Sequence, residues 1–122
     1  MAKDTVMQRL DTLKDRSTLQ LTTLGRKTGK RHTVPIWFLI DGNTVYLATM
    51  RMRRNWPRNI IKNGHVELDI GGTVFTGRAK RIVDAKRLEH VKALLRQKYW
   101  AAWLGSWFGM GPEGAFAMTV EA

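Results

Sequence analysis

Residues 25–29 of the sequence, Gly-Arg-Lys-Thr-Gly, carry the residue types that bind an anion. Two glycines four positions apart let backbone N–H groups approach a ligand closely, and Arg26 and Lys27 between them add charged hydrogen-bond donors. The segment is not a Walker loop, because the spacing to Lys30 is one residue short and a strand pattern follows. It is therefore predicted either to hold a phosphate group or to form a hairpin turn with solvated basic side chains.

Positive charge is concentrated in the same third of the chain. The 122-residue sequence has a formal net charge of +11. Residues 26–62 contain nine basic residues and one acidic residue, Asp41, so this segment alone carries +8. Its basic residues are Arg26, Lys27, Lys30, Arg31, Arg51, Arg53, Arg54, Arg58 and Lys62. Such a field attracts a nucleic acid, an anionic membrane, or a phosphorylated or polycarboxylate ligand.

Other catalytic constellations are not predicted. The chain has no cysteine, which excludes a disulfide scaffold, a zinc ribbon and a thiol enzyme. The histidines, His32, His65 and His90, fall in different predicted elements without the spacing of metal ligands. Neither Ser17 nor Ser106 stands in the glycine-flanked turn that exposes a nucleophile. No metal is therefore predicted, and no residue is assigned as catalytic.

Aromatic residues near the C-terminus form the other candidate binding feature. The sequence has five tryptophans, a high number for its length. Trp100, Trp103 and Trp107 are spaced by three and four residues, and Phe108 follows directly. These four side chains are predicted to line a substrate pocket for a small, planar, hydrophobic acceptor. The alternatives are a packed helix face, a dimer interface, or association with a membrane surface.

The elements that position these residues are predicted from hydrophobic periodicity. Residues 4–16 repeat apolar positions at the spacing of one helix face, and residues 84–104 form the longest helical pattern. A loop and then a short helix, ended by Gly64, are predicted for residues 50–64. Strands are predicted at residues 17–24, 33–40, 44–49, 65–70, 73–83 and 115–120.

Turn signals between these strands indicate the fold class. Asp41-Gly42-Asn43 and Gly71-Gly72 predict two hairpins, and Gly77 predicts a bulge within residues 73–83. Six strands joined mainly by hairpins, with helices at the edges, are typical of a mainly β, α+β protein built as a small antiparallel barrel. The length and the absence of a linker predict a single domain over residues 1–122.

The order of several motifs is similar to that of a known family. The sequence resembles the deazaflavin-dependent nitroreductase family of flavin and deazaflavin oxidoreductases in residues 21–30 (LTTLGRKTGK), 33–38 (TVPIWF), 41–42 (DG), 45–49 (VYLAT), 56 (W), 59 (N) and 63–68 (NGHVEL). The resemblance covers roughly residues 19–82, about half of the chain. The ordered set of motifs is far more specific than any one of them.

The resemblance implies a fold, an assembly and a cofactor site. The fold is a six-stranded antiparallel split β-barrel with flanking helices, like that of flavin reductases and pyridoxamine-phosphate oxidases. It is commonly dimeric, so a homodimer is expected. The cofactor lies in a groove beside the barrel. The residues that the resemblance places at the cofactor are Arg26, Lys27, Thr28 and Gly29 near its phosphate, Pro35, Ile36, Trp37, Ala48 and Thr49 along its ring system, and Asn59.

One loop departs from the family pattern. Arg51, Arg53 and Arg54 stand where the family has a glycine-containing loop that clasps phosphate through its backbone. Arginine side chains are therefore expected to take over this part of cofactor binding.

The cofactor implied by the resemblance is coenzyme F-420, a deazaflavin, or FMN. F-420 carries a phosphodiester and a tail of several glutamates, whereas FMN carries one terminal phosphate, so the +8 segment matches the longer anion better. The implied activity is hydride transfer to an electron-poor acceptor such as a quinone, nitroarene or enone. Candidate proton donors are Tyr46, Tyr99, His32 and Thr49.

Alternative functions remain open from the sequence. An FMN-binding reductase, or a cofactor-binding protein without turnover, would use the same site. A basic nucleic-acid-binding β-barrel would use the loops and tryptophans to hold single strands. The ordered motifs favour a reductase of the nitroreductase or quinone reductase type, and no nucleic-acid partner is expected. The polar N-terminal residues and the lack of a long apolar run predict a cytoplasmic protein.

Overall fold

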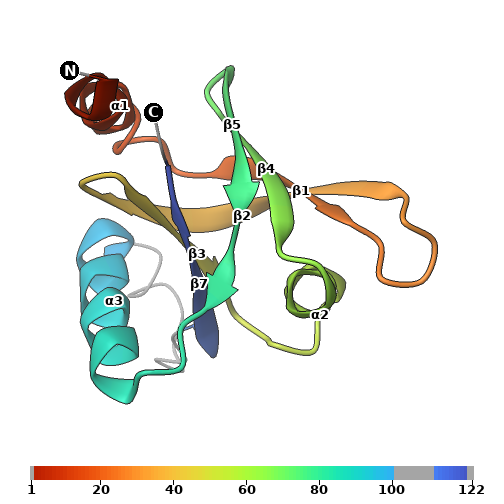
Figure 1. Cartoon of the computed structure of the whole chain (residues 1–122). Coiled ribbons are helices and arrows are strands. Elements are labelled where there is room, and N and C mark those ends of the chain that lie inside the picture. The colour runs from red at the N-terminus through yellow and green to blue at the C-terminus, as the bar shows by residue number, and fades with distance from the viewer. Residues whose placement is uncertain (1, 101–111, 121–122) are drawn as a thin grey trace.

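The described part of the chain folds into one antiparallel sheet and three helices (Figure 1). A computed structural model describes residues 2–100 and 112–120. The helices are α1 (Ala2–Asp11), α2 (Asn55–Lys62) and α3 (Ala85–Lys98). The strands are β1 (Leu19–Leu24), β2 (Arg31–Asp41), β3 (Thr44–Thr49), β4 (His65–Ile70), β5 (Thr73–Arg78), β6 (Lys80–Arg81) and β7 (Gly114–Thr119).

The strands pair in the order β5-β4-β1-β2-β3-β7-β6, and every neighbouring pair is antiparallel. The longest strand, β2, pairs with β1 up to Ile36 and with β3 from Trp37 onward. The β2–β3 and β4–β5 hairpins turn at Gly42 and Gly71, whose φ values of 62° and 60° suit glycine. Both predicted hairpins are confirmed.

The two ends of the sheet are joined at one residue. β5 and β6 stand at opposite ends of the strand order, yet only Ala79 separates them in the chain. The sheet therefore curls until its ends meet, which makes it a barrel. At this corner the Ala79 N–H donates to Gly64 O (2.8 Å).

This corner corrects two sequence predictions. The predicted single strand over residues 73–83 is wrong, because β5 pairs with β4 whereas β6 pairs with β7. The fold consequently has seven strands in its described part rather than six. The predicted bulge at Gly77 is also wrong, since Gly77 pairs in register with Val66.

The barrel interior holds the main core. Phe38, Leu47 and Phe116 point into it from three strands and are fully buried. Helix α1 closes one end of the barrel with Leu10, and α2 closes the opposite end with Trp56, whose ring lies 5.7 Å from that of Phe116 (Figure 1). The predicted split β-barrel with flanking helices is therefore confirmed, with one additional strand.

Helix α3 covers the outer face of the sheet (Figure 1). Val91 and Leu95 are fully buried there. Asp84 caps the helix by accepting a hydrogen bond from Lys86 N (3.1 Å). The helix ends at Lys98, short of the predicted end at residue 104, and residues 101–104 lie outside the described residues. Likewise α1 ends at residue 11 rather than 16.

Tyr99, just after α3, joins three parts of the chain. Its hydroxyl accepts a hydrogen bond from Phe38 N (3.1 Å) and has two carbonyl oxygens within donating distance, Ser17 O (2.8 Å) and Phe38 O (3.1 Å). Its ring stacks on Trp37 with centroids 4.3 Å apart. Burial raises the pKa of Tyr99, which keeps the hydroxyl protonated and able to donate.

Gly64→Ala is expected to destabilise the fold at the corner. A Cβ at position 64 would lie 2.8 Å from Ala79 O, so the backbone itself would have to shift. Gly77→Ala is the matched control, because its Cβ would meet only the flexible end of Met118 at 3.0 Å. Urea unfolding should show a loss of about 1–3 kcal/mol for Gly64→Ala, the usual cost of overpacking, and a smaller loss for the control. Equal losses would contradict the special role of the corner.

Lys98 is expected to make stability depend on pH. Its Nζ donates to Phe38 O (3.0 Å), and burial lowers its pKa from 10.5 to about 8, partly opposed by the Asp15 carboxylate. Between about pH 8 and pH 10.5 the unfolded state binds more protons at Lys98 than the folded state does. The contribution of Lys98 to the free energy of unfolding therefore rises with pH in this range. Lys98→Met should raise Tm at pH 7 and remove the increase of stability with pH. Thermal unfolding of both proteins at pH 7, 9 and 10 tests this, and equal slopes would exclude Lys98 as the cause.

Candidate functional site

A hollow of about 490 Å³ opens between the β1–β2 hairpin and α2. We call it the hairpin hollow. Arg26, Lys27, Thr28 and Lys30 line it on the hairpin side, and Asn59 lines it on the helix side. Arg26, Lys27 and Thr28, which were predicted to lie near a phosphate, therefore share one concave surface with the predicted Asn59.

The backbone of the loop is hydrogen-bonded within the hairpin. Gly25 N donates to Lys30 O (2.7 Å), and Gly29 N donates to Gly25 O (2.8 Å). Gly29 has a φ of 73°, which a tight turn of this kind requires. The two glycines thus shape the turn, and their own N–H groups are bonded within the hairpin. That the loop backbone approaches an anion stays a prediction.

Asn59 fixes Arg26 in this hollow. The side chain of Asn59 is 2% exposed. Its Oδ1 accepts hydrogen bonds from Arg26 N (3.2 Å) and Arg26 Nη1 (3.0 Å), and its Nδ2 donates to Thr23 Oγ1 (3.1 Å). Asn55, one helical turn earlier, also lies within hydrogen-bond distance of Arg26 Nη1 (3.4 Å). Asn59 therefore orients the arginine, and its amide is already satisfied by the protein.

A second hollow, of about 180 Å³, lies where β2 and β3 run side by side. We call it the strand hollow. All five residues predicted to lie along a cofactor ring are among those that line it: Pro35, Ile36, Trp37, Ala48 and Thr49. The structure thus brings this predicted set together.

Two of these side chains are held by neighbours. The Trp37 ring is fixed by its stack on Tyr99. The Thr49 hydroxyl donates to Arg51 O (2.8 Å) and accepts from Arg51 N (3.2 Å), so it braces the loop that follows β3. Trp56 of α2 lines both the strand hollow and the hairpin hollow, so the two hollows are neighbours.

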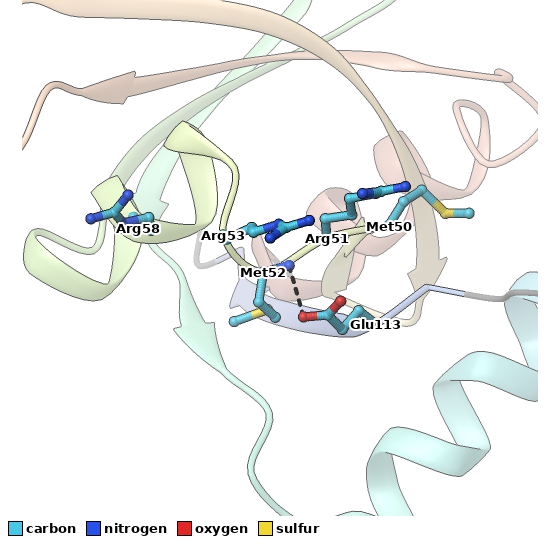
Figure 2. A pocket seen from close by; sticks show the side chains of 6 residues that line it. All are labelled: Met50, Arg51, Met52, Arg53, Arg58 and Glu113. Atoms are coloured by element: carbon cyan, nitrogen blue, oxygen red, sulfur yellow. Dashed lines mark hydrogen bonds between the residues drawn. The ribbon is translucent and has the colours of Figure 1, made fainter.

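The loop after β3 forms a third hollow, of about 620 Å³ (Figure 2). We call it the arginine hollow. Arg51 and Arg53 come from the loop itself, and Arg58 comes from α2. The predicted Arg54 lines the neighbouring strand hollow instead. Met50 lines both hollows, so the arginine hollow lies next to the strand hollow.

Glu113, directly before β7, holds this loop from the strand that pairs with β3. Its backbone N donates to Thr49 O (2.9 Å), and its Oε1 accepts a hydrogen bond from Met52 N (3.2 Å), drawn dashed in Figure 2. A Cβ on the next residue, Gly114, would lie 2.6 Å from Met52 Sδ, so the side chain of Met52 packs tightly there. Glu113 and Gly114 together fix the course of the arginine-bearing loop.

Among the described residues, none of the basic side chains that line the three hollows forms an ion pair, although Glu113 lines the arginine hollow. The ion pairs found among the described residues are Lys14–Asp11, Arg31–Glu67 and Lys92–Glu89. Arg31 is therefore compensated by Glu67 at 2.7 Å, whereas no such pair involves the basic residues that line the hollows. Uncompensated positive charge in concave surfaces favours an anionic ligand.

Several of these residues were not predicted. Trp56 belongs to the same motif block as Asn59, so the sequence contained a signal for it. Met50 and Met52 lie in or beside the arginine-rich segment, whereas Arg58 is one of the basic residues predicted to attract an anionic ligand. Glu113 gave no local signal, because it acts on a loop about sixty residues away in the sequence.

The aromatic cluster is only partly within the structure. Trp100 is 62% exposed. Trp103, Trp107 and Phe108 lie outside the described residues, so the assignment of these four side chains to a substrate pocket stays a prediction. Within residues 2–100 and 112–120, no group of three or more His, Asp or Glu side chains could hold a metal ion. No helix in these ranges is long and apolar enough to cross a membrane.

Comparison with known proteins identifies the family. The sequence pattern that defines the F420H2-dependent quinone reductase family matches residues 2–103. A solved F420-H2 dependent reductase superposes with a TM-score of 0.65 at 22% identity, covering 87% of this chain and 95% of that one. A putative pyridoxamine 5'-phosphate oxidase from Listeria innocua superposes with a TM-score of 0.70 at 17% identity, covering 100% of this chain and 95% of that one. A third structure, described as a domain-swapped dimer, superposes with a TM-score of 0.67 at 20% identity, covering 99% of this chain and 100% of that one.

The chain therefore belongs to the F420H2-dependent quinone reductase family. It is a deazaflavin-dependent reductase, and its cofactor is coenzyme F-420. The residues present fit this coenzyme. Uncompensated cations match its phosphodiester and glutamates, and the strand hollow, lined by Pro35, Trp37 and Ala48, matches a flat ring.

Glu113 provides a test of the loop's role. Glu113→Ala removes the acceptor of Met52 N–H and frees the loop, so the affinity for F-420 should fall by about 1 kcal/mol, the scale of one net hydrogen bond. Glu113→Gln keeps an acceptor oxygen and removes a negative charge near Arg51 and Arg53, so affinity should stay equal or rise. Fluorescence titration with F-420 measures both. Equal weakening by the two variants would contradict a role in holding the loop.

Proposed function

We propose that the three hollows form one groove that binds F-420 and a quinone acceptor together. The observation that carries the proposal is their adjacency: Trp56 is shared by the hairpin and strand hollows, and Met50 by the strand and arginine hollows. A groove with cationic ends and an apolar centre suits a ligand with a flat ring and an anionic extension.

The phosphodiester is assigned to Arg26 and Lys27 in the hairpin hollow. Arg26 is held there by the Asn59 amide, and Lys27 is exposed and without an acidic partner in the described ion pairs. Arg51, Arg53 and Arg54 act on the negative charge of the coenzyme at longer range. Such exposed charges raise the rate of encounter more than they stabilise a fold.

The ring system is assigned to the strand hollow. Pro35, Ile36 and Trp37 from β2 would lie along it, with Ala48 and Thr49 from β3. When bound and reduced, F-420 supplies a hydride equivalent, and a quinone that takes it up with a proton becomes a hydroquinone. The protein's part is to hold both rings face to face and to exclude water from between them.

Water is assigned as the donor of the proton that the quinone takes up with the hydride. Of the four candidate donors, the hydroxyls of Tyr99 and Thr49 are committed to backbone carbonyl oxygens. Tyr46 faces α3, where Arg87 lies over its ring. His32 lines the hairpin hollow, on the phosphate side of the groove.

The acceptor side is assigned to the aromatic cluster of Trp100, Trp103, Trp107 and Phe108. A flat apolar wall favours quinones, with nitroarenes and enones as further planar acceptors. We also propose a single domain over residues 1–122 and a homodimer, as the domain-swapped dimer of similar fold suggests. Light scattering would measure the dimer directly, and membrane-surface association stays a prediction.

Stopped-flow oxidation tests the function. Protein loaded with pre-reduced F-420 is mixed with menadione, a nitroarene or cyclohexenone, and reoxidation is followed by absorbance. Menadione should oxidise the protein-bound coenzyme much faster than it oxidises free coenzyme. Lys27→Ala should weaken coenzyme binding by about 1.5–3 kcal/mol, the scale of a hydrogen bond to a charged group. Rates equal to those of free coenzyme for all three acceptors would contradict the proposal.

A further inference from the structure

A fourth hollow, of about 380 Å³, lies at the corner where β5 passes into β6, beside the outer face of α2. We call it the corner hollow. The residues that matter for its chemistry are Ile60, Ile61, Phe116, Arg78, Lys80 and Arg81. None of them lines the hairpin, strand or arginine hollow. The corner hollow is therefore separate from the proposed coenzyme groove.

The floor of the corner hollow is apolar. Ile60 and Phe116 belong to the barrel core and are almost completely buried, as is Ala79 at the corner itself. Ile61, the next residue on α2, is 57% exposed and extends this apolar surface outward. A large exposed aliphatic side chain that continues a concave apolar surface is a common feature of binding sites.

The rim of the corner hollow is cationic. Arg78, Lys80 and Arg81 are all exposed, and none of them takes part in the ion pairs found in the described residues. No acidic residue of ranges 2–100 and 112–120 lines the hollow. Across the β4–β5 ladder Arg78 stands opposite His65, which adds no negative charge. Three positive charges thus surround an apolar floor without compensation.

The walls of the hollow are held by backbone contacts. Ala79 N donates to Gly64 O (2.8 Å), and no space exists for a side chain at Gly64. Lys80 and Arg81 are in register with Ala117 and Phe116 of β7. The site is therefore formed by the closure of the barrel itself, and its basic residues stand on strands rather than on a loop.

We propose that the corner hollow binds a small organic anion with an apolar body, such as a medium-chain carboxylate. A neutral hydrophobic molecule would leave three cations uncompensated, and a nucleic acid would pair with the cations but leave the apolar floor exposed. A molecule that has both parts satisfies both surfaces, because its carboxylate accepts charge-assisted hydrogen bonds while its chain covers Ile60 and Ile61. The volume is within the range of small-molecule sites.

Calorimetry with octanoate and octan-1-ol tests this proposal. The full chain is first saturated with F-420, so that the coenzyme groove is filled and failure of one proposal does not imply failure of the other. Octanoate should bind with one site per chain and at least tenfold more tightly than octan-1-ol. Equal affinities, or no octanoate binding, would overturn the proposal.

Two variants locate the site. Lys80→Gln with Arg81→Gln should reduce octanoate affinity at least tenfold, whereas Lys86→Gln on α3 is the matched control and should leave it unchanged. F-420 affinity, measured in parallel, should be the same in both variants. Equal effects of the two variants on octanoate would place the binding elsewhere. A change of oligomeric state in the double variant would mean that a second copy of the chain occupies the hollow, which also overturns the proposal.

Discussion

Closure of the sheet at Ala79 is the constraint on which the rest of the structure depends. The chain leaves one end of the sheet with β5 and enters the other end with β6 after a single residue, so the sheet has to curl completely. The Ala79–Gly64 hydrogen bond fixes the start of β4 against this corner. Because α2 ends just before Gly64, the same contact also sets where α2 lies across the barrel end.

The position of α2 in turn builds the site. One helix of eight residues supplies Trp56 to the core and to two hollows, Asn59 to the hairpin, and Arg58 to the arginine hollow. Polar side chains on a helix that closes a barrel end can reach both the strand ends and the loops around them. The site therefore comes from elements far apart in the sequence, which only the closed barrel brings together.

The sequence predicted what is local and missed what depends on pairing partners. Hairpins at Gly42 and Gly71 have turn signals of their own, and the ring-side residues follow from the resemblance. The division of residues 73–83 into two strands, β5 and β6, could not be predicted, because a chain segment that changes its pairing partner keeps its alternating pattern. That the N–H groups of Gly25 and Gly29 bond within the hairpin could not be predicted either, because it depends on the turn that forms around them. Glu113 acts on the loop that follows the neighbouring strand, about sixty residues away in the sequence, where periodicity carries no information.

The way in which Arg26 is held has a consequence for ligand exchange. Its guanidinium is restrained by the neutral amides of Asn55 and Asn59 and not by a carboxylate. An incoming anion therefore has no internal salt bridge to break, and the entropy of ordering this long side chain is lost when the protein folds and not when the ligand arrives. Since neither amide titrates, the hydrogen bonds that restrain the orientation of this arginine do not depend on the protonation of Asn55 or Asn59. An anion can therefore bind and leave at this position without proton transfer to or from the groups that hold Arg26.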